Sequence, residues 1–291
     1  MFSINALSIT WVDKNRTYEA AEIDLMINRA VGIFKRNSLN ADSKIGLFAK
    51  PGIDYVVSLC AVLQMQAVPV LIDLGLGNQL GNILTQVQVS ALVYTHDHFD
   101  EVELSRDVEN VIYFCMDGEQ KGALSWPEQL NLNLDFSATE EITSDICKLM
   151  FFESDSVGVD HELSNITNQS LKFCQNYFIT ASDVILSART MCCEESIVMG
   201  IFAGIITGAR VCLVASWLTK SIYEVIDLNF ISIVILQIEQ AIELASKIKE
   251  TDLVPANLRL VIISGQSSES VVADLLERKL EVGFYLEERN V

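Results

Sequence analysis

The chain has 291 residues, of which 50% are hydrophobic and 20% are charged, and its formal net charge at pH 7 is −19. The length exceeds the roughly 100–200 residues of a typical single domain, so it allows two packed lobes or one large α/β unit. The negative charge and the lack of a basic stripe exclude a nucleic-acid partner, because the phosphates would be repelled.

Predicted strands and helices alternate from about residue 44 to the end of the chain. In the first half, apolar runs of strand length occupy residues 45–49, 68–72, 91–94 and 111–114. Longer runs of helical period occupy residues 18–36, 53–66 and 79–87. This alternation is typical of βαβ units, so we expect an α/β fold built on a doubly wound, mostly parallel sheet.

Residues 117–144 are richer in Gly, Asn, Pro and acids and have no sustained period, which indicates a connection between two lobes. We therefore expect an N-terminal α/β lobe of residues 1–146 and a second α/β lobe of residues 147–291. In the second lobe, strands are predicted at residues 148–152, 184–188, 211–214, 231–236, 258–263 and 282–285. Helices are predicted at residues 169–178, 195–207, 221–228, 238–249 and 269–280.

The most apolar stretch, residues 197–218, is about long enough to cross a bilayer at roughly 20 residues. Its middle, Thr207-Gly208-Ala209-Arg210, has the composition of a helix C-cap and turn before a β-rich run, which predicts no membrane span. The N-terminus lacks the basic start and long apolar run of a signal peptide. The seven cysteines lie mostly in apolar segments without a Cys-x-x-Cys pair, so we expect reduced, buried thiols and a cytoplasmic location.

The most informative stretch is the predicted strand 148–152 and the ten residues after it, which have the layout of a strand leading into a phosphate-binding loop. Such loops direct backbone N–H groups and a lysine at a polyanion. Residues 152–170 instead contain no Lys or Arg and four acids, which are Glu153, Asp155, Asp160 and Glu162. One carboxylate about 4 Å from a phosphate oxygen costs about 4 kcal/mol at an effective dielectric near 20, so a nucleotide is disfavoured here.

Several short sequence motifs occur in order along the chain. Thr17-Tyr18-Glu19 and Asn28-Arg29-Ala30 lie in the first predicted helix, and residues 43–55 and 61–73 each join a strand to a helix or turn. Further motifs lie at residues 183–186, 200–211 and 258–266. In this order they resemble the N-terminal domain of the adenylate-forming ligase superfamily: acyl-CoA synthetases, aryl-acid ligases and the adenylation domains of nonribosomal peptide synthetases. The resemblance covers nearly the whole chain and implies two doubly wound, mostly parallel sheets with flanking helices.

The resemblance also assigns a candidate site. The family's phosphate loop reads Thr-Ser-Gly-Ser/Thr-Thr-Gly-x-Pro-Lys-Gly and corresponds to residues 153–162 here. Ser154, Ser156 and Gly158 match it, whereas Asp155 replaces a glycine and His161 replaces the lysine. These five residues form the candidate cofactor-binding site, a degenerate phosphate loop. Asp tolerates a left-handed backbone better than most residues, so the turn itself is expected to persist.

The family's cofactors would be ATP and Mg²⁺, and the acidic loop disfavours both, although a magnesium ion would offset part of the repulsion. The chain ends near residue 291, where the family places its adenine-contacting motif. The resemblance therefore implies that the adenine motif, the ribose-binding aspartate and the mobile C-terminal domain with its catalytic lysine have no counterpart here. We assign no catalytic residue and no metal ligand.

Other groups of chemically active residues have simpler interpretations. His96-Asp97-His98 and Asp100 have a spacing that suits Zn²⁺ or Mn²⁺, but polar loops are expected anyway after a strand. The acids of the loop suit Ca²⁺ poorly, because the glycine is at the wrong offset for an EF-hand. Two further segments, Cys192-Cys193 and residues 264–269, are interpreted as the starts of helices rather than as a redox pair and an oxyanion turn.

Three functions remain open. The leading hypothesis is a truncated, adenylate-forming ligase-like pseudoenzyme that binds a protein partner, such as a ligase, a carrier protein or another enzyme of an acyl-activation or natural-product pathway. The first alternative is an active ligase subunit that a second chain completes. The second alternative is a binder of a small acyl or aryl acid that does not activate it.

Overall fold

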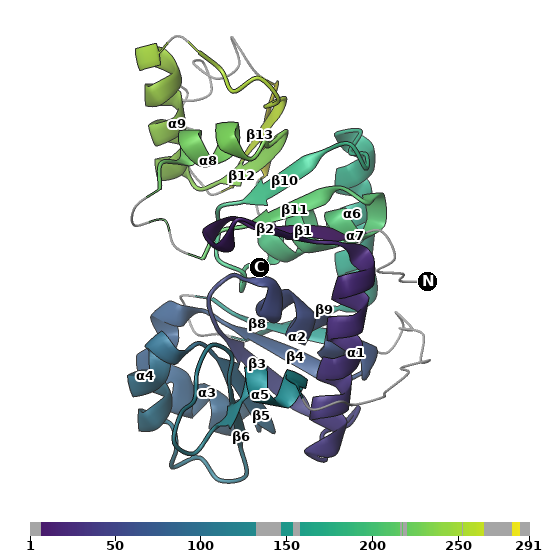
Figure 1. Cartoon of the computed structure of the whole chain (residues 1–291), viewed down its shortest axis with the longest axis vertical. Coiled ribbons are helices and arrows are strands. Elements are labelled where there is room, and N and C mark those ends of the chain that lie inside the picture. The colour runs from purple at the N-terminus through teal and green to yellow at the C-terminus, as the bar shows by residue number, and fades with distance from the viewer. Residues whose placement is uncertain are drawn as a thin grey trace. The chain divides into compact units, whose positions relative to one another are not determined.

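The computed structural model describes residues 7–131, 147–153, 158–215, 217, 220–251, 253–264 and 281–285. These residues form two compact units, each built on a seven-stranded sheet (Figure 1). The first unit contains residues 19–169 and 191–194, and the second contains residues 6–18, 170–190 and 195–291 as far as they are described. The chain thus passes between the units more than once.

The sheet of the first unit has the strand order β7-β6-β5-β3-β4-β8-β9. All neighbouring pairs are parallel except β8 and β9, which form an antiparallel hairpin at one edge. The strands are β3 (Lys44–Phe48), β4 (Val68–Ile72), β5 (Ala91–Tyr94), β6 (Ile112–Cys115), β7 (Leu124–Ser125), β8 (Lys148–Phe152) and β9 (Val159–Glu162). Every residue of β5 is buried, as expected for a central parallel strand that is covered on both faces.

The sheet of the second unit has the order β14-β13-β12-β10-β11-β1-β2. Again all neighbouring pairs are parallel except one, the antiparallel pair β1 and β2 at the edge. The strands are β1 (Ser8–Trp11), β2 (Arg16–Tyr18), β10 (Val184–Ser187), β11 (Arg210–Leu213), β12 (Ile233–Leu236), β13 (Leu260–Ser264) and β14 (Glu281–Tyr285).

Helices connect the parallel strands and cover the sheets. In the first unit they are α1 (Ala20–Arg36), α2 (Ile53–Gln64), η2 (Leu74–Gln79), α3 (Leu80–Val87), η3 (His96–His98), α4 (Phe99–Leu104) and α5 (Trp126–Asn131). The second unit contains η1 (Val12–Lys14), the π-helix η4 (Ser196–Phe202), α7 (Ala203–Thr207), α8 (Ile222–Leu228) and α9 (Ile238–Thr251). Helix α6 (Leu163–Asn176) begins in the first unit and ends in the second.

Each unit has its own hydrophobic core. In the first unit, Phe34 of α1 packs against Phe114 and Trp126 at ring-centroid distances of 5.7 and 5.6 Å. In the second unit, the strands β10 and β12 and the helices α8 and α9 contribute aliphatic side chains to one buried cluster. Burial at roughly 25 cal/mol per Å² of apolar surface makes these clusters the main source of stability.

Among the described residues, five helix-to-strand connections end in the same way. The first or second residue after the helix has a left-handed backbone, and the next residue donates a 6→1 hydrogen bond back to the helix, as in a Schellman motif. The left-handed residues are Ser38, Gln66, Gln88, Phe178 and Phe230, with φ between 51° and 62°. Glycine is the usual residue at this position, and Phe is among the less suitable ones.

The expected α/β class and the mostly parallel sheets are confirmed, but the lobe boundary at residue 146 does not coincide with the division of the structure. Strands β8 and β9 follow residue 146 and yet belong to the sheet of the first unit, because β8 pairs with β4. At the other end of the chain, β1 pairs with β11 and so joins the sheet of the second unit. The helix predicted at residues 269–280 lies outside the described residues.

Within the apolar stretch of residues 197–218, the part up to residue 213 forms η4, α7 and β11 rather than one long helix. Gly208 ends α7 with φ 76°, which is the predicted C-cap. Among the helices that the structure describes, none combines the length and the apolar character needed to cross a membrane.

Candidate functional site

The candidate phosphate loop joins two antiparallel strands. Phe151 of β8 pairs with Val159 of β9, and Lys148 pairs with Glu162. Residues 159–162 were expected to be part of the loop, and they form a strand instead because the backbone of β8 is available as a partner. Of the five predicted site residues, Gly158 and His161 are described, whereas Ser154, Asp155 and Ser156 lie outside the described residues.

Gly158 lies against the ring of Phe152. A Cβ atom at this position would be 2.5 Å from Cζ of Phe152, closer than real Cβ contacts come. Phe152 is 1% exposed, so its ring has little room to move away. The glycine is therefore required for the close approach of the chain to the end of β8.

His161 is held by two neighbours within the first unit. Its ring makes an edge-on contact with Phe151 at 5.2 Å between centroids, and its Nδ1 lies 3.5 Å from Oε1 of Glu194. The two side chains are 21% and 20% exposed. When the imidazole is protonated, the carboxylate of Glu194 balances its charge, so the residue in the place of the family's lysine offers no free positive charge.

Glu194 belongs to a short segment, Met191–Glu194, that joins the first unit although its neighbours in sequence belong to the second. The hydroxyl of Tyr55 donates to the carbonyl of Met191 at 3.3 Å, and the thiol of Cys192 lies 3.4 Å from Oδ2 of Asp73. Burial, and then the nearby Cys192, raises the pKa of Tyr55 well above its usual value, so this phenol stays a neutral donor.

Asp73 connects the segment to the candidate loop. Its backbone N–H donates to the carbonyl of Phe152 at 2.9 Å, at the point where β8 ends. Its Oδ1 accepts a 2.7 Å hydrogen bond from the N–H of Gly75 and so caps η2. Through Asp73, the end of β4, the end of β8 and the thiol of Cys192 form one connected group. The role of Asp73 in this group depends on contacts between distant parts of the chain. The sequence placed Asp73 at the end of a strand but did not indicate these contacts.

The described part of the hairpin carries two acids on β9 and one lysine, Lys148, at the start of β8. Asp160 and Glu162 are exposed on β9, and the hydroxyl of Ser164 donates to Glu162 at 3.4 Å. Glu194 is the carboxylate beside His161, and Asp160 and Glu162 are the neighbours of His161 along β9. The arrangement repels a triphosphate and suits a cationic or neutral group better.

The His96–His98 segment, a candidate metal site by spacing, directs its side chains to separate partners. The ring of His98 lies edge-on against Phe48 at 5.3 Å, and Asp97 forms an ion pair with Lys50. Burial raises the pKa of Asp97, but the hydrogen bond and charge of Lys50 outweigh burial and lower it below its usual value. Among the described residues, no group of three or more His, Cys, Asp or Glu side chains converges as a metal site would require.

One titratable group was not expected from the sequence. Asp54 is the second residue of α2, and burial raises its pKa to about 6, with a further rise from the nearby carboxylate of Asp117. The N–H of His96 donates to Oδ1 of Asp117 at 2.6 Å. Neither carboxylate could be singled out from the sequence, because the segments that carry Asp54, His96 and Asp117 meet only at the carboxyl edge of the sheet.

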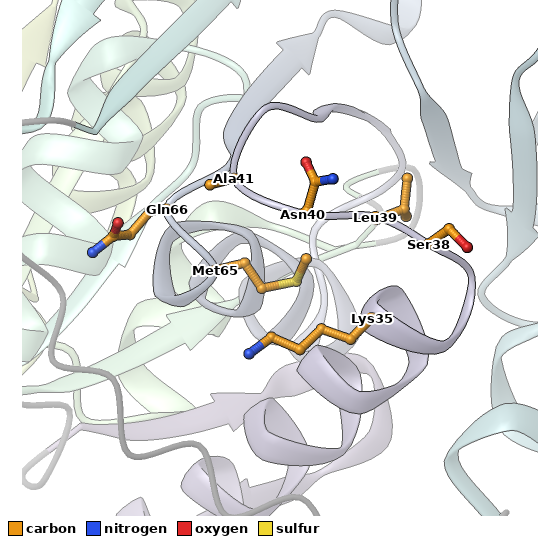
Figure 2. A pocket seen from close by; sticks show the side chains of 7 residues that line it. All are labelled: Lys35, Ser38, Leu39, Asn40, Ala41, Met65 and Gln66. Atoms are coloured by element: carbon orange, nitrogen blue, oxygen red, sulfur yellow. The ribbon is translucent and has the colours of Figure 1, made fainter.

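A cavity of about 440 Å³ lies elsewhere in the first unit (Figure 2). It is formed where α1 and α2 end, and Figure 2 shows Lys35 on one side and Asn40 on the other, with Met65 between them. The full lining is Lys35, Ser38, Leu39, Asn40, Ala41, Met65 and Gln66. It includes no residue of the candidate loop, so it does not extend that site.

Comparison with known proteins places this geometry in context. A family model described as "AMP-binding enzyme" matches residues 4–284. The N-terminal domain of FACL13 from Mycobacterium tuberculosis has a similar structure, with a TM-score of 0.83 at 13% identity over 96% of this chain and 71% of that chain. A search of curated proteins found no match.

Two CoA ligases are also similar in structure. The anthranilate CoA ligase AuaEII, solved in complex with anthranoyl-AMP, has a TM-score of 0.84 at 14% identity and 97% coverage of this chain. A benzoate CoA ligase from Burkholderia xenovorans LB400 has a TM-score of 0.83 at 15% identity and the same coverage. The chain spans 55% and 57% of the lengths of these two ligases.

Proposed function

The chain belongs to the AMP-binding enzyme family, and from this premise we propose that it is an adenylate-forming ligase-like protein that does not activate acids on its own. It acts by binding a protein partner in an acyl- or aminoacyl-activation pathway, such as a ligase, a carrier protein or another pathway enzyme. The fold is that of the N-terminal domain of adenylate-forming ligases. The loss of activity is inferred from the chemistry of the hairpin.

The observation that carries this proposal is the pairing of His161 with Glu194. A phosphate-binding loop needs a cation that is free to approach the phosphates. Here Nδ1 of His161 lies 3.5 Å from a carboxylate oxygen, and the next acids along the strand, Asp160 and Glu162, are exposed. The residues that are present therefore do not fit ATP with Mg²⁺ well, and the sequence adds Asp155 to the negative charge of the loop.

Electrostatic energies show the size of the effect. Each carboxylate about 4 Å from a phosphate oxygen costs about 4 kcal/mol per charge pair, and about 8 kcal/mol corresponds to the whole of a micromolar affinity. Two uncompensated carboxylates at that distance are enough to abolish nucleotide binding at cellular concentrations. The same negative surface favours a partner that presents basic side chains, since opposite charges increase the rate of association.

Calorimetric titration with ATP and Mg²⁺, together with acid-dependent pyrophosphate exchange over a panel of acyl and aryl acids, tests the proposal. We expect neither binding heat nor exchange from the native chain. The double variant His161→Lys with Glu194→Gln is expected to gain measurable ATP affinity, and Asp100→Asn, which removes an exposed acid from α4, serves as the matched control. Micromolar ATP affinity with acid-dependent exchange in the native chain would refute the proposal.

A second candidate function is a ligase subunit that another chain completes. It is favoured by the coverage, since the chain corresponds to 55% and 57% of the solved chains of two CoA ligases. It is also favoured by Gly158, which matches the family's loop and lies in close contact with Phe152 at the end of β8. Co-purification of a chain that restores acid-dependent pyrophosphate exchange would support this function, and a purified complex without exchange would exclude it.

A further inference from the structure

Four large apolar side chains are exposed where connections lead into three neighbouring strands of the second unit. Phe178 precedes β10 and is 82% exposed, Leu228 and Phe230 precede β12 and are 75% and 62% exposed, and Leu253 precedes β13 and is 63% exposed. These strands are parallel and adjacent in the order β13-β12-β10, so the connections meet at the amino edge of the sheet. We call these four side chains the amino-edge patch.

The connections that carry the patch contain no charged residues. Residues 177–182, 228–232 and 253–258 contain no Asp, Glu, Lys or Arg, although 20% of the residues in the chain are charged. Asp183 and Arg259, at two of the borders, neutralise each other at 2.9 Å. At the other two borders, Asp227 and Asp252 directly precede Leu228 and Leu253 in sequence. The amino-edge patch is therefore an apolar area with few charges on a protein with a net charge of −19.

Two residues of the patch have a backbone conformation that suits their bulky side chains poorly. Phe178 and Phe230 have φ of 51° and 56°, in the left-handed region that bulky residues rarely adopt. At the corresponding helix ends of the first unit, the left-handed residues are Ser38, Gln66 and Gln88, which carry no large apolar group. Strained residues that keep an exposed aromatic side chain are typical of binding sites.

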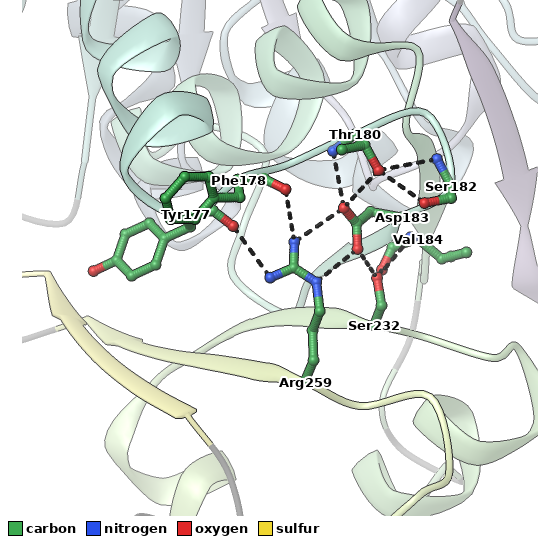
Figure 3. A network of polar contacts seen from close by, with 8 residues as sticks. All are labelled: Tyr177, Phe178, Thr180, Ser182, Asp183, Val184, Ser232 and Arg259. Carbon is green, nitrogen blue, oxygen red and sulfur yellow. Dashed lines mark hydrogen bonds and ion pairs between the residues drawn. The ribbon is translucent and has the colours of Figure 1, made fainter.

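A polar network holds this edge rigid (Figure 3). The guanidinium of Arg259 donates to the carbonyls of Tyr177 and Phe178 at 3.1 and 3.4 Å and to both carboxylate oxygens of Asp183. The hydroxyl of Ser232 donates to Asp183 at 2.8 Å, which adds the connection before β12. Because the network links the connections before β10, β12 and β13, Phe178 is presented on a fixed frame, and little entropy is lost when it is buried.

We propose that the amino-edge patch is a self-association surface on which a second copy of this chain docks through the same patch around a two-fold axis. Charge identifies the occupant. Two copies with a net charge of −19 each repel each other over most of their surfaces, and the patch, which has few charges, lets them approach with fewer acids face to face. Interfaces between identical subunits are likewise depleted of charge at their centres and enriched in aromatic residues.

The size of the patch sets the expected strength. Four side chains of this type and exposure offer roughly 500 Å² of apolar surface per copy, below the roughly 800 Å² per partner of a standard interface. We therefore expect a reversible dimer with a Kd of about 10 µM. Because salt screens the repulsion between the two acidic copies, the dimer becomes tighter as the ionic strength rises.

Sedimentation velocity on the whole chain between about 1 and 100 µM, at about 0.05 and 0.5 M NaCl, tests the proposal. The double variant Phe178→Asn with Phe230→Asn removes both rings, and Asn tolerates the left-handed backbone, so the fold is retained. Leu104→Asn is the matched control, because Leu104 is 79% exposed on α4 of the first unit. We expect the double variant to raise Kd at least about tenfold and the control to leave it unchanged.

Four results would overturn the proposal. They are a native chain that stays monomeric at the highest concentration and salt, a double variant that dimerises as the native chain does, a control that weakens the dimer equally, and a dimer that dissociates as salt rises. The last result would indicate association through opposite charges and a basic partner surface. The first and last measurements use only the native chain, so they hold even if a variant misfolds. The proposal is independent of nucleotide binding at the hairpin.

Discussion

Replacing Asp183 with Asn removes the charge at the centre of the network in the second unit with almost no change in size. The native carboxylate is 6% exposed and accepts two hydrogen bonds from Arg259 at 2.9 and 3.0 Å. It also accepts from the N–H of Thr180 at 2.9 Å and from the hydroxyl of Ser232 at 2.8 Å. An Asn side chain offers one acceptor oxygen and turns its NH₂ group toward one of these donors, so at least one buried donor loses its partner.

The magnitude follows from these bonds. Hydrogen bonds to a charged group contribute about 1.5–3 kcal/mol each, and breaking a buried ion pair by removing one partner costs about 3–5 kcal/mol. Arg259 is 35% exposed, so water replaces part of what it loses. We therefore expect Asp183→Asn to lower the free energy of unfolding of the second unit by about 2–3 kcal/mol at pH 7.

The pH dependence of this loss gives a second check. Burial raises the pKa of Asp183, but its hydrogen bonds, first of all from Arg259, outweigh burial and lower the pKa below the usual value. A carboxyl whose folded pKa is lowered stabilises the protein above its unfolded pKa, near 3.9, and this contribution disappears as the pH falls through the folded pKa. The difference in the free energy of unfolding between the native chain and the Asp183→Asn variant is therefore largest at neutral pH and vanishes in acid.

Hydrogen exchange at the amides of β10 and β12, with urea unfolding of the whole chain, measures the effect. The two probes are needed because two compact units need not unfold in one step. The double variant of Asp183→Asn with Arg259→Met closes a double-mutant cycle, in which we expect a coupling energy of about 1–3 kcal/mol. If Asp183→Asn changed neither the exchange nor the unfolding free energy by more than about 0.5 kcal/mol, our reading of the network as structural would be wrong.

Three further predictions concern other sites. Gly158→Ala places a methyl group 2.5 Å from the ring of Phe152, so we expect a loss of about 1–3 kcal/mol in urea unfolding of the first unit, and an unchanged midpoint would contradict this contact. The variant Asp54→Asn mimics the protonated carboxyl of Asp54, whose pKa is raised to about 6. Because the folded protein favours this protonated form, we expect the variant to raise the free energy of unfolding by about 1–2 kcal/mol at pH 8 and to leave it unchanged below about pH 4. A gain in stability that is independent of pH would point to another cause. Phe178→Asn alone relieves strain at φ 51° and should raise the melting temperature of a dilute sample, whereas a lower value would show that the ring stabilises the fold.

The predicted strands were most accurate where a strand is apolar throughout. The bounds of β4, β5 and β8 are as predicted: β4 and β5 are continuous apolar runs, as strands covered on both faces are, and β8 is apolar after its first residue, Lys148. Strand β9 was not predicted, since its sequence Val159-Asp160-His161-Glu162 is mostly polar and its backbone is ordered by pairing with β8. Strands β1 and β2 were missed for a similar reason, because β1 is defined by its pairing with β11, about 200 residues further along the chain.

The position of the candidate site after β8 stays a prediction, and its contacts could not be predicted from the sequence. The apolar run predicted β8, and the resemblance singled out Gly158 and His161. The pairing of His161 with Glu194 and the contact of Asp73 with Cys192 join segments 33 and 119 residues apart in sequence. No local pattern encodes such distances, so these contacts could only come from the folded chain.

The passage of the chain between its two units limits how the protein can be divided. A fragment that ends near residue 146 would lack β8, and β4, with the sequence Val68-Pro-Val-Leu-Ile72, would become an open sheet edge. Open apolar edges recruit other strands and lead to aggregation. A workable dissection would keep residues 19–169 together and supply Met191–Glu194 separately, so a single protease cut or a single gene truncation cannot release either half intact.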